Sequence, residues 1–296
     1  MTTEIVLQGV NKFYGKKQAL KNVNLKINEG MFGLLGRNGA GKTTLMKILA
    51  TLIQKNNGEV FVCGLPINNA KEIRSIIGYL PQDFSMYGNM TAYEALDYLG
   101  VLSCMNKSDR MKIIPELLEK VNLHNNHKTK VKAMSGGMKR RLGIAQAILH
   151  NPKVLIVDEP TAGLDPEERV RFRNLLCEIA ENRIVILSTH IVGDIEATCE
   201  NVAVLDEGIV LYNGTVTKLL EDAKGKIYSA DVSKLEIENV KKRFTVNSMV
   251  TMGNHINVRF IVDDGNKDAL FKGASVCEAN VEDAYMYLMH KKRGDR

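Results

Sequence analysis

The stretch Gly36-Arg37-Asn38-Gly39-Ala40-Gly41-Lys42-Thr43-Thr44 decides the fold of this chain. It follows an apolar run from Met31 to Leu35, which predicts a buried strand, and it opens a helical pattern of apolar residues that continues to Leu52. A strand, a glycine-rich loop and a helix in this order are the setting of a phosphate-binding loop. The stretch therefore predicts an α/β domain that binds a nucleotide.

The composition of the loop follows from this chemistry. Backbone N–H groups can surround phosphates only where no Cβ keeps the chain at a distance, and glycine permits that approach. The amides then form an anion site at the positive end of the following helix. Lys42 adds a cation for the β- and γ-phosphates, and Thr43 offers a hydroxyl to Mg²⁺. The alternative is a glycine-rich turn without a ligand, against which the flanking strand and helix argue. The residues expected to bind the nucleotide here are Gly36, Asn38, Gly39, Ala40, Gly41, Lys42, Thr43 and Thr44.

Composition limits the class of protein. A chain of 296 residues suits one large domain, or one domain with a small appendage. No apolar run approaches the roughly 18 to 20 residues of a membrane span, and the N-terminus lacks the pattern of a signal peptide, so we expect a cytoplasmic location. The 5 cysteines are scattered and are expected to be reduced. The net charge of +6 is spread along the chain, so no nucleic acid partner is expected.

Two kinds of strand pattern occur. Short continuous apolar runs at 76–77, 154–157, 184–187 and 202–205 fit a parallel sheet that is buried on both faces. The first thirty residues instead alternate around a turn at Tyr14-Gly15, and with a further strand at 60–62 they predict an antiparallel β layer.

The pattern becomes helical from about residue 84 to 150. Thr91 and Glu94 form a capping box before a helix from Ala92 to Met105, and Ser108 is expected to cap the next one, which Pro115 breaks or kinks. A third helix is expected from about Met138 to Leu149. Beyond this part, Asp165 as N-cap predicts a helix that packs on the sheet.

A hairpin through Asp206-Glu207-Gly208 closes the first domain, expected to span residues 1–215. The remaining residues, 216–296, predict a small α+β domain. Its expected elements are strands at 227–232, 249–252 and 256–262, a charged helix from about Leu235 and a last helix from Val281 to Met289.

A pair of carboxylates follows a buried strand. The run from Val154 to Val157 ends in Asp158-Glu159, and the carboxyl ends of the strands are where an open α/β sheet binds its ligands. Asp158 is expected to hold Mg²⁺, and Glu159 to polarise the attacking water, a role worth about 10² to 10⁴ in rate. Two solvated acids at a strand end are the alternative.

The segment Met134-Ser135-Gly136-Gly137-Met138 resembles the signature Leu-Ser-Gly-Gly-Gln of the ATP-binding subunits of ABC transporters. The resemblance implies that Ser135, Gly136 and Gly137 complete the nucleotide site of a second subunit, so that ATP is sandwiched between two chains. Met134 and Met138 depart from the family pattern, the first with similar volume and the second with loss of a polar side chain. Alone, Ser-Gly-Gly is equally compatible with a flexible turn.

Other positions match the same family in order. The resemblance implies that Gln82 lies in the loop between the Mg²⁺ site and the helical insertion, and that His190 is the switch histidine near the γ-phosphate. It further implies that Tyr14 stacks on adenine and that residues 162–165 form the loop through which the two subunits communicate. A surface glutamine, a structural histidine and an exposed turn tyrosine are the alternatives. The family therefore implies a catalytic set of Glu159, His190 and Gln82, and Mg²⁺ ligands Thr43, Gln82 and Asp158.

This resemblance covers residues 1 to about 215. It implies a P-loop ABC cassette with a mixed sheet core, an antiparallel β layer and a helical subdomain, acting as a Mg²⁺-dependent ATPase. The expected partners are a second ABC subunit, as homodimer or heterodimer, and a separately encoded integral membrane permease. This chain is expected to be peripheral, on the cytoplasmic face of the cell membrane. Residues 84–90 are expected to contact that permease.

The C-terminal segment of the sequence indicates the direction of transport. Val281-Glu282-Asp283-Ala284-Tyr285 resembles the end of exporter subunits of the antibiotic-resistance and bacteriocin-immunity type, the ABC-2 branch, which implies export. Two alternatives are a cassette for DNA repair or translation and a regulatory module that binds ATP without turnover. The first normally has a coiled coil or tandem cassettes, and the second would be expected to lose Glu159 or His190.

Overall fold

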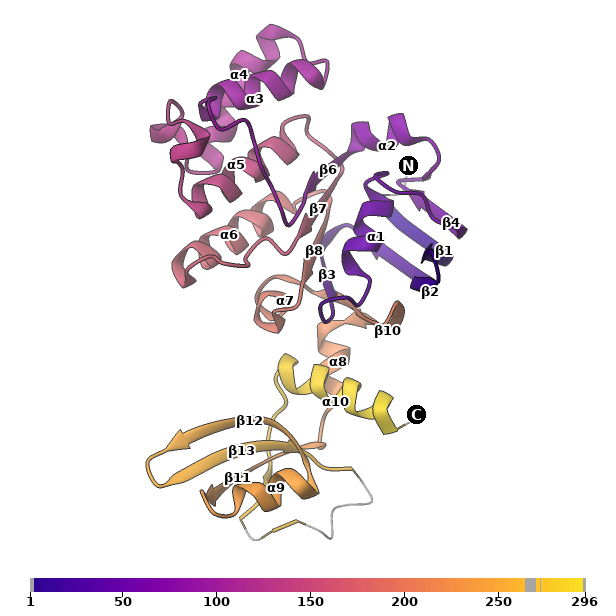
Figure 1. Cartoon of the computed structure of the whole chain (residues 1–296), viewed down its shortest axis with the longest axis vertical. Coiled ribbons are helices and arrows are strands. Elements are labelled where there is room, and N and C mark those ends of the chain that lie inside the picture. Colours follow the sequence, from indigo (N-terminus) through magenta and orange to yellow (C-terminus); the bar gives the residue numbers. More distant parts are fainter. Residues whose placement is uncertain (1–2, 264–269, 272, 295–296) are drawn as a thin grey trace. The chain divides into compact units, whose positions relative to one another are not determined.

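The computed structural model describes residues 3–263, 270–271 and 273–294. The chain divides into two compact units, Met1–Asn213 and Gly214–Arg296 (Figure 1). The division lies two residues before the boundary expected after residue 215. Each unit is described by itself below.

A six-stranded sheet forms the centre of the first unit. Four of its neighbouring pairs, β3–β8, β3–β9, β7–β8 and β6–β7, are parallel, and every residue of β7 and β8 is buried. Side chains on both faces of these strands must therefore be accommodated in apolar layers, which explains the continuous apolar runs. In spatial order the strands are β10 (Ile209–Thr215), β9 (Asn201–Asp206), β3 (Gly30–Leu35), β8 (Ile184–Thr189), β7 (Val154–Asp158) and β6 (Ile77–Leu80).

A second sheet of the first unit is antiparallel, as the alternating pattern predicts. Ile5 pairs with Ile27 of the neighbouring strand on one side and with Val62 on the other, and all three side chains are buried. They share one apolar core with α1 (Lys42–Leu49), the helix that the glycine-rich loop opens. The strands run in the order β2 (Lys17–Asn28), β1 (Glu4–Tyr14), β4 (Asn57–Val62) and β5 (Leu65–Pro66), and α2 (Ala70–Ile76) follows them in the chain. The fold class predicted from the sequence is thus confirmed.

The helical part of the first unit departs from expectation in its boundaries. The capping box of Thr91 and Glu94 is present, but α3 ends at Leu102 rather than Met105. The N-cap of α4 is Asn106, which accepts from the Asp109 amide at 2.9 Å, and not Ser108, whose hydroxyl donates to Asn106 instead. The helices are α3 (Ala92–Leu102), α4 (Lys107–Lys120) and α5 (Gly136–Ile148), and the short 3₁₀ turns are His124–Asn126 and Val131–Ala133.

Two further details of this part differ from the sequence-based expectation. Of the break or kink expected at Pro115, the break is absent, because α4 continues through this residue, which lies on the exposed side of the helix, where water can satisfy the carbonyl left without a donor. Helix α5 begins at Gly136, two residues before Met138, because the Ser135 hydroxyl accepts from the Met138 amide at 3.2 Å and caps the helix there.

Helices cover both faces of the six-stranded sheet (Figure 1). Helix α6 (Pro166–Ile179) has the expected N-cap, Asp165, which accepts from the Glu168 amide at 2.9 Å. Its apolar face is buried, and α7 (Val192–Thr198) lies against α6. Figure 1 shows α5, α6 and α7 on one side of the sheet and α1 on the other.

The second unit is built on a four-stranded sheet beside α8 (Val216–Asp222), α9 (Ile237–Arg243) and α10 (Val281–Gly294). Its core contains Phe244 and Phe260, whose ring centroids are 4.9 Å apart. Asp283 of the tail segment is buried and accepts hydrogen bonds from Arg259 and Asn247, so this residue joins α10 to the sheet. The strands are β12 (Thr245–Met252), β13 (His255–Ile261), β11 (Ile227–Ser233) and β14 (Ser275–Val276).

Candidate functional site

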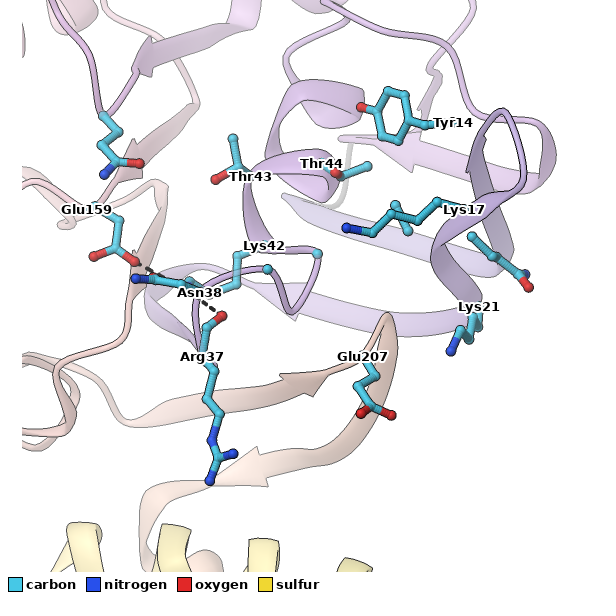
Figure 2. Close-up of a pocket in the computed structure, with 15 residues that line it drawn as sticks. Tyr14, Lys17, Lys21, Arg37, Asn38, Lys42, Thr43, Thr44, Glu159 and Glu207 are labelled. Atoms are coloured by element: carbon cyan, nitrogen blue, oxygen red, sulfur yellow. Dashed lines mark hydrogen bonds and ion pairs between the residues drawn. The ribbon is translucent and has the colours of Figure 1, made fainter.

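A cavity of about 540 Å³ opens over the glycine-rich loop (Figure 2). It brings together residues that lie far apart in the sequence: Tyr14 from the end of β1, the loop itself, Gln82 after β6 and Glu159 after β7. The residues that line it are Tyr14, Lys17, Gln18, Ala19, Lys21, Arg37, Asn38, Gly39, Gly41, Lys42, Thr43, Thr44, Gln82, Glu159 and Glu207.

Two glycines of the loop are required by the fold of the chain itself. A Cβ at Gly36 would lie 2.2 Å from the carbonyl oxygen of Leu205. Gly41 has φ of 111°, and a Cβ there would lie 2.8 Å from the carbonyl oxygen of Ala19. The loop is therefore pressed between β9 and β2, which fixes the start of α1 beneath the cavity.

Lys42 and Glu159 form a buried ion pair at the floor of the cavity. The two side chains are each 6% exposed, and the Lys42 Nζ lies 3.2 Å from the Glu159 carboxylate. Lys42 Nζ also donates to the Gly36 carbonyl at 2.7 Å. On its other side the Glu159 carboxylate lies 2.5 Å from Nδ1 of His190, which donates when that nitrogen carries the proton. Glu159 is thus held between a cation and an imidazole.

Asp158 lies one residue before Glu159 and is fully buried. One carboxylate oxygen accepts from the Ser188 hydroxyl at 2.9 Å, whereas the other has no hydrogen-bond partner among the described residues. Burial raises the pKa of Asp158 above its ordinary value, and the Ser188 and Thr43 hydroxyls together with Lys42 act in the opposite direction.

This oxygen chemistry fits Mg²⁺. A carboxylate oxygen without a partner, near a threonine hydroxyl, supplies the hard oxygen ligands that Mg²⁺ prefers. The part of the chain that the structure describes contains no group of three or more His, Cys, Asp or Glu side chains able to hold a metal by themselves. Phosphate oxygens and water must therefore complete such a site, as is usual for Mg²⁺ bound with a nucleotide.

Several predicted residues lie next to the cavity without lining it. Ala40 is buried behind the loop, and its carbonyl accepts from the Gly208 amide at 2.9 Å. Gly36, Asp158 and His190 support the lining residues through the contacts given above. Ser135, Gly136 and Gly137 are not brought into this cavity, and the first two are exposed.

The two signature glycines differ in what surrounds them. A Cβ at Gly136 would meet nothing within 4 Å, whereas a Cβ at Gly137 would lie 2.7 Å from Oε2 of Glu168. Glu168 also lies 3.5 Å from Arg141, one turn further along α5. A side chain at position 137 would therefore have to displace the end of the Glu168 side chain, while nothing in the described part of this chain excludes a side chain at position 136.

The cavity also has a cationic wall that sequence reasoning missed. Lys17, Ala19 and Lys21 of β2 all line the cavity, and so does Gln18, because the register of β2 against β1 shifts at these residues. Figure 2 shows the side chain of Lys17 reaching from this strand toward the loop, with Glu207 beneath. The wall also depends on the docking of the β9–β10 turn, whose Gly208 carbonyl accepts from the Lys21 amide at 2.8 Å, and the sequence alone does not show this contact.

The structure has no helix, among its described residues, that is long and apolar enough to cross a membrane. A family model described as ABC transporter matches residues 20–162. The uncharacterized ABC transporter ATP-binding protein YxlF of Bacillus subtilis (strain 168) is 33% identical over 96% of this chain and 99% of its own length.

Two other relatives carry more specific names. The linearmycin resistance ATP-binding protein LnrL of Bacillus subtilis (strain 168) is 32% identical over 81% of this chain and 76% of its own length. The Nod factor export ATP-binding protein I of Rhizobium meliloti (strain 1021) is 35% identical over 79% of this chain and 72% of its own.

Solved structures of similar chains show the same fold. The dimeric, post-hydrolysis state of the ATP-binding cassette MJ0796 with ADP and Pi has a TM-score of 0.65 and 28% identity, over 71% of this chain and 98% of that one. The cbiO1 chain of Clostridium perfringens, part of the complex cbiONQ, has a TM-score of 0.69 and 26% identity, over 82% and 96%.

Lys17 offers a test of the cationic wall. We predict that Lys17→Gln raises the dissociation constant for ATP about two- to fivefold, the range of an exposed charge interaction, and that the difference shrinks with added salt. Lys16→Gln is the matched control, because the neighbouring Lys16 does not line the cavity. Equal effects of the two substitutions in a nucleotide titration would contradict a specific role of Lys17.

Proposed function

Because this chain belongs to the ATP-binding subunits of ABC transporters, which hydrolyse ATP to energise transport, we propose that it drives export through a separately encoded permease. Relatives named for linearmycin resistance and Nod factor export support the direction. The observation that carries the mechanism is the position of Glu159, between Lys42 and His190 and next to the partnerless oxygen of Asp158.

Nucleotide binding uses the wall and floor of the cavity. The loop amides and the N-terminus of α1 bind the phosphates, and Lys42 turns from Glu159 to the β- and γ-phosphates. Tyr14, 49% exposed at the cavity, stacks on adenine. Thr43, Asp158 and Gln82 would hold Mg²⁺, which neutralises charge on the phosphates when bound.

Hydrolysis then depends on Glu159. Once Lys42 binds phosphate, the Glu159 carboxylate is free to accept a proton from water, in the manner of a general base. The imidazole of His190, 2.5 Å from this carboxylate, keeps it oriented. The His190 side chain is 43% exposed and is therefore accessible to a phosphate above the cavity.

The base assignment can be tested directly. We predict that Glu159→Gln lowers kcat for ATP hydrolysis at least about tenfold while ATP still binds, because the amide cannot accept the proton. Glu181→Gln, at an exposed position after α6, is the matched control. Steady-state hydrolysis by the purified chain, alone and with its permease, is the measurement, and an unchanged kcat in Glu159→Gln would rule out this role.

A second subunit is part of the proposal. Ser135 and Gly136 are exposed at the N-terminus of α5 and lie outside the cavity of their own chain, so they are open to a nucleotide held by another subunit rather than to one in that cavity. The dimeric MJ0796 cassette supports this arrangement.

Gly136 separates a partner effect from a folding effect. We predict that Gly136→Ala leaves the melting temperature and ATP binding by the monomer unchanged, because its Cβ meets nothing within 4 Å. ATP-driven dimerisation in a Glu159→Gln background should weaken at least about tenfold, since a methyl group keeps the phosphate away from the amide. Gly193→Ala, in an equally open place at the start of α7, is the control for sedimentation experiments. Unaltered dimerisation would contradict the shared site.

The helical subdomain offers an apolar surface for the permease. Tyr87 and Tyr98 are exposed and contact edge to face at 5.5 Å, and Val101 and Leu102 extend this face along α3. Phe84 and Met86 line an adjoining cavity of about 270 Å³. Single exposed apolar residues are ordinary, but such a continuous group is typical of an interaction surface.

The docking proposal predicts a loss of association. Met86→Gln combined with Tyr87→Ser should reduce copurification with the permease several-fold, while hydrolysis by the isolated chain is retained. Leu235→Ser is the control, because Leu235 is 94% exposed in the other unit. Undiminished copurification would argue that residues 84–90 are not the contact.

A further inference from the structure

One buried carboxylate of the first unit has no part in the chemistry above. Among the described residues the buried acids are Asp158, Glu159, Asp194 and Asp283. The first two lie in the site, and Asp283 joins two elements of the second unit. Asp194 is 0% exposed in α7, four residues after His190.

Asp194 is hydrogen-bonded to the segment that follows Glu159. Its Oδ2 accepts from the Thr161 hydroxyl at 2.5 Å, and Thr161 is itself only 1% exposed. Its Oδ1 has no hydrogen-bond partner among the described residues, and Arg173 of α6 lies 3.7 Å away. Arg173 also donates to the Gly193 carbonyl at 3.2 Å, so it holds the first turn of α7.

This arrangement is costly if it serves stability alone. A buried carboxylate with one full hydrogen bond and a distant cation is poorly compensated, and apolar side chains would fill the space as well or better. A specific geometry is what the carboxylate provides. It fixes where Thr161 lies relative to α7.

The two segments so joined leave adjacent parallel strands at the same edge of the sheet. Asp158 pairs in register with Ser188, and Glu159 and His190 follow. From there one segment continues through Thr161 into residues 162–165, and the other continues through Ile191 into α7. Asp194 reconnects them beyond the catalytic pair, as α6 and α7 pack together (Figure 1).

We propose that Asp194 is a positioning residue that couples the γ-phosphate contact at His190 to residues 162–165, the loop facing the other subunit. This inference rests on the proposed dimeric ATPase. When His190 shifts on binding the γ-phosphate, α7 shifts with it, and the Asp194–Thr161 bond carries the displacement into the 162–165 loop. Each nucleotide site thereby influences closure at the other.

Isosteric substitutions test the bond. Thr161→Val removes the hydroxyl and Asp194→Asn removes the charge. Thr161→Ser keeps a hydroxyl and should therefore rescue the function that Thr161→Val loses. Glu196→Gln, an exposed acid two residues along the same helix, is the matched control. Three quantities are measured below the melting temperature: ATP affinity of the monomer, ATP-driven dimerisation in a Glu159→Gln background, and the Hill coefficient of hydrolysis with Glu159 intact.

We expect Thr161→Val and Asp194→Asn to weaken dimerisation about three- to thirtyfold and to move the Hill coefficient toward about 1. The ATP affinity of the monomer should stay within about twofold, because neither residue lines the cavity. The double variant should be no worse than the poorer single one, as expected for one shared interaction.

Other results overturn the inference. A lower melting temperature with unchanged dimerisation and Hill coefficient in Thr161→Val would show that the bond is only structural, even where Asp194→Asn fails to fold. An equal defect in Glu196→Gln, or no rescue by Thr161→Ser, would also reject it. Absence of ATP-driven dimerisation in the Glu159→Gln parent would reject the proposed dimeric function itself, which distinguishes the two failures.

Discussion

The ion pair between Lys42 and Glu159 is the interaction on which the rest of the site depends. Each partner is buried, and removing one member of such a pair typically costs roughly 3 to 5 kcal/mol because the other charge is left uncompensated. In the proposed mechanism the phosphates of the nucleotide bind Lys42 in place of Glu159. The pair would then make the release of Glu159 conditional on nucleotide, with His190 as the contact that remains.

Strand pairing explains why these groups meet. Parallel strands β3, β8 and β7 end at one edge of the sheet, so the glycine-rich loop, His190 and the Asp158-Glu159 pair arrive there from three separate parts of the chain. Side chains that leave the sheet at one edge share a buried environment of low dielectric constant, which strengthens the electrostatic interactions between them. Burial at the same place raises the pKa of Asp158, whose second oxygen has no hydrogen-bond partner among the described residues and is the ligand proposed for Mg²⁺.

Much of this was predictable from the sequence, and each exception has a physical reason. The parallel sheet, the antiparallel layer and the cap at Asp165 follow from periodicity and local hydrogen bonding, which a sequence displays. Asn106 replaced Ser108 as a cap because several polar residues compete locally, and Pro115 was tolerated because of its exposure. Lys17 and Asp194 could not be identified, because their roles depend on a turn and a helix that dock from distant positions.

The signature segment shows how one chain can be shaped for a partner. A side chain at Gly137 would have to displace the end of Glu168, so a contact within the subunit favours a small residue there. Gly136 has open space around it, so packing within the described chain gives no reason for glycine there. The cavity of the same chain does not reach Gly136 either. Both observations are what the proposed dimer requires, in which the phosphates held by one subunit approach the Gly136 amide of the other.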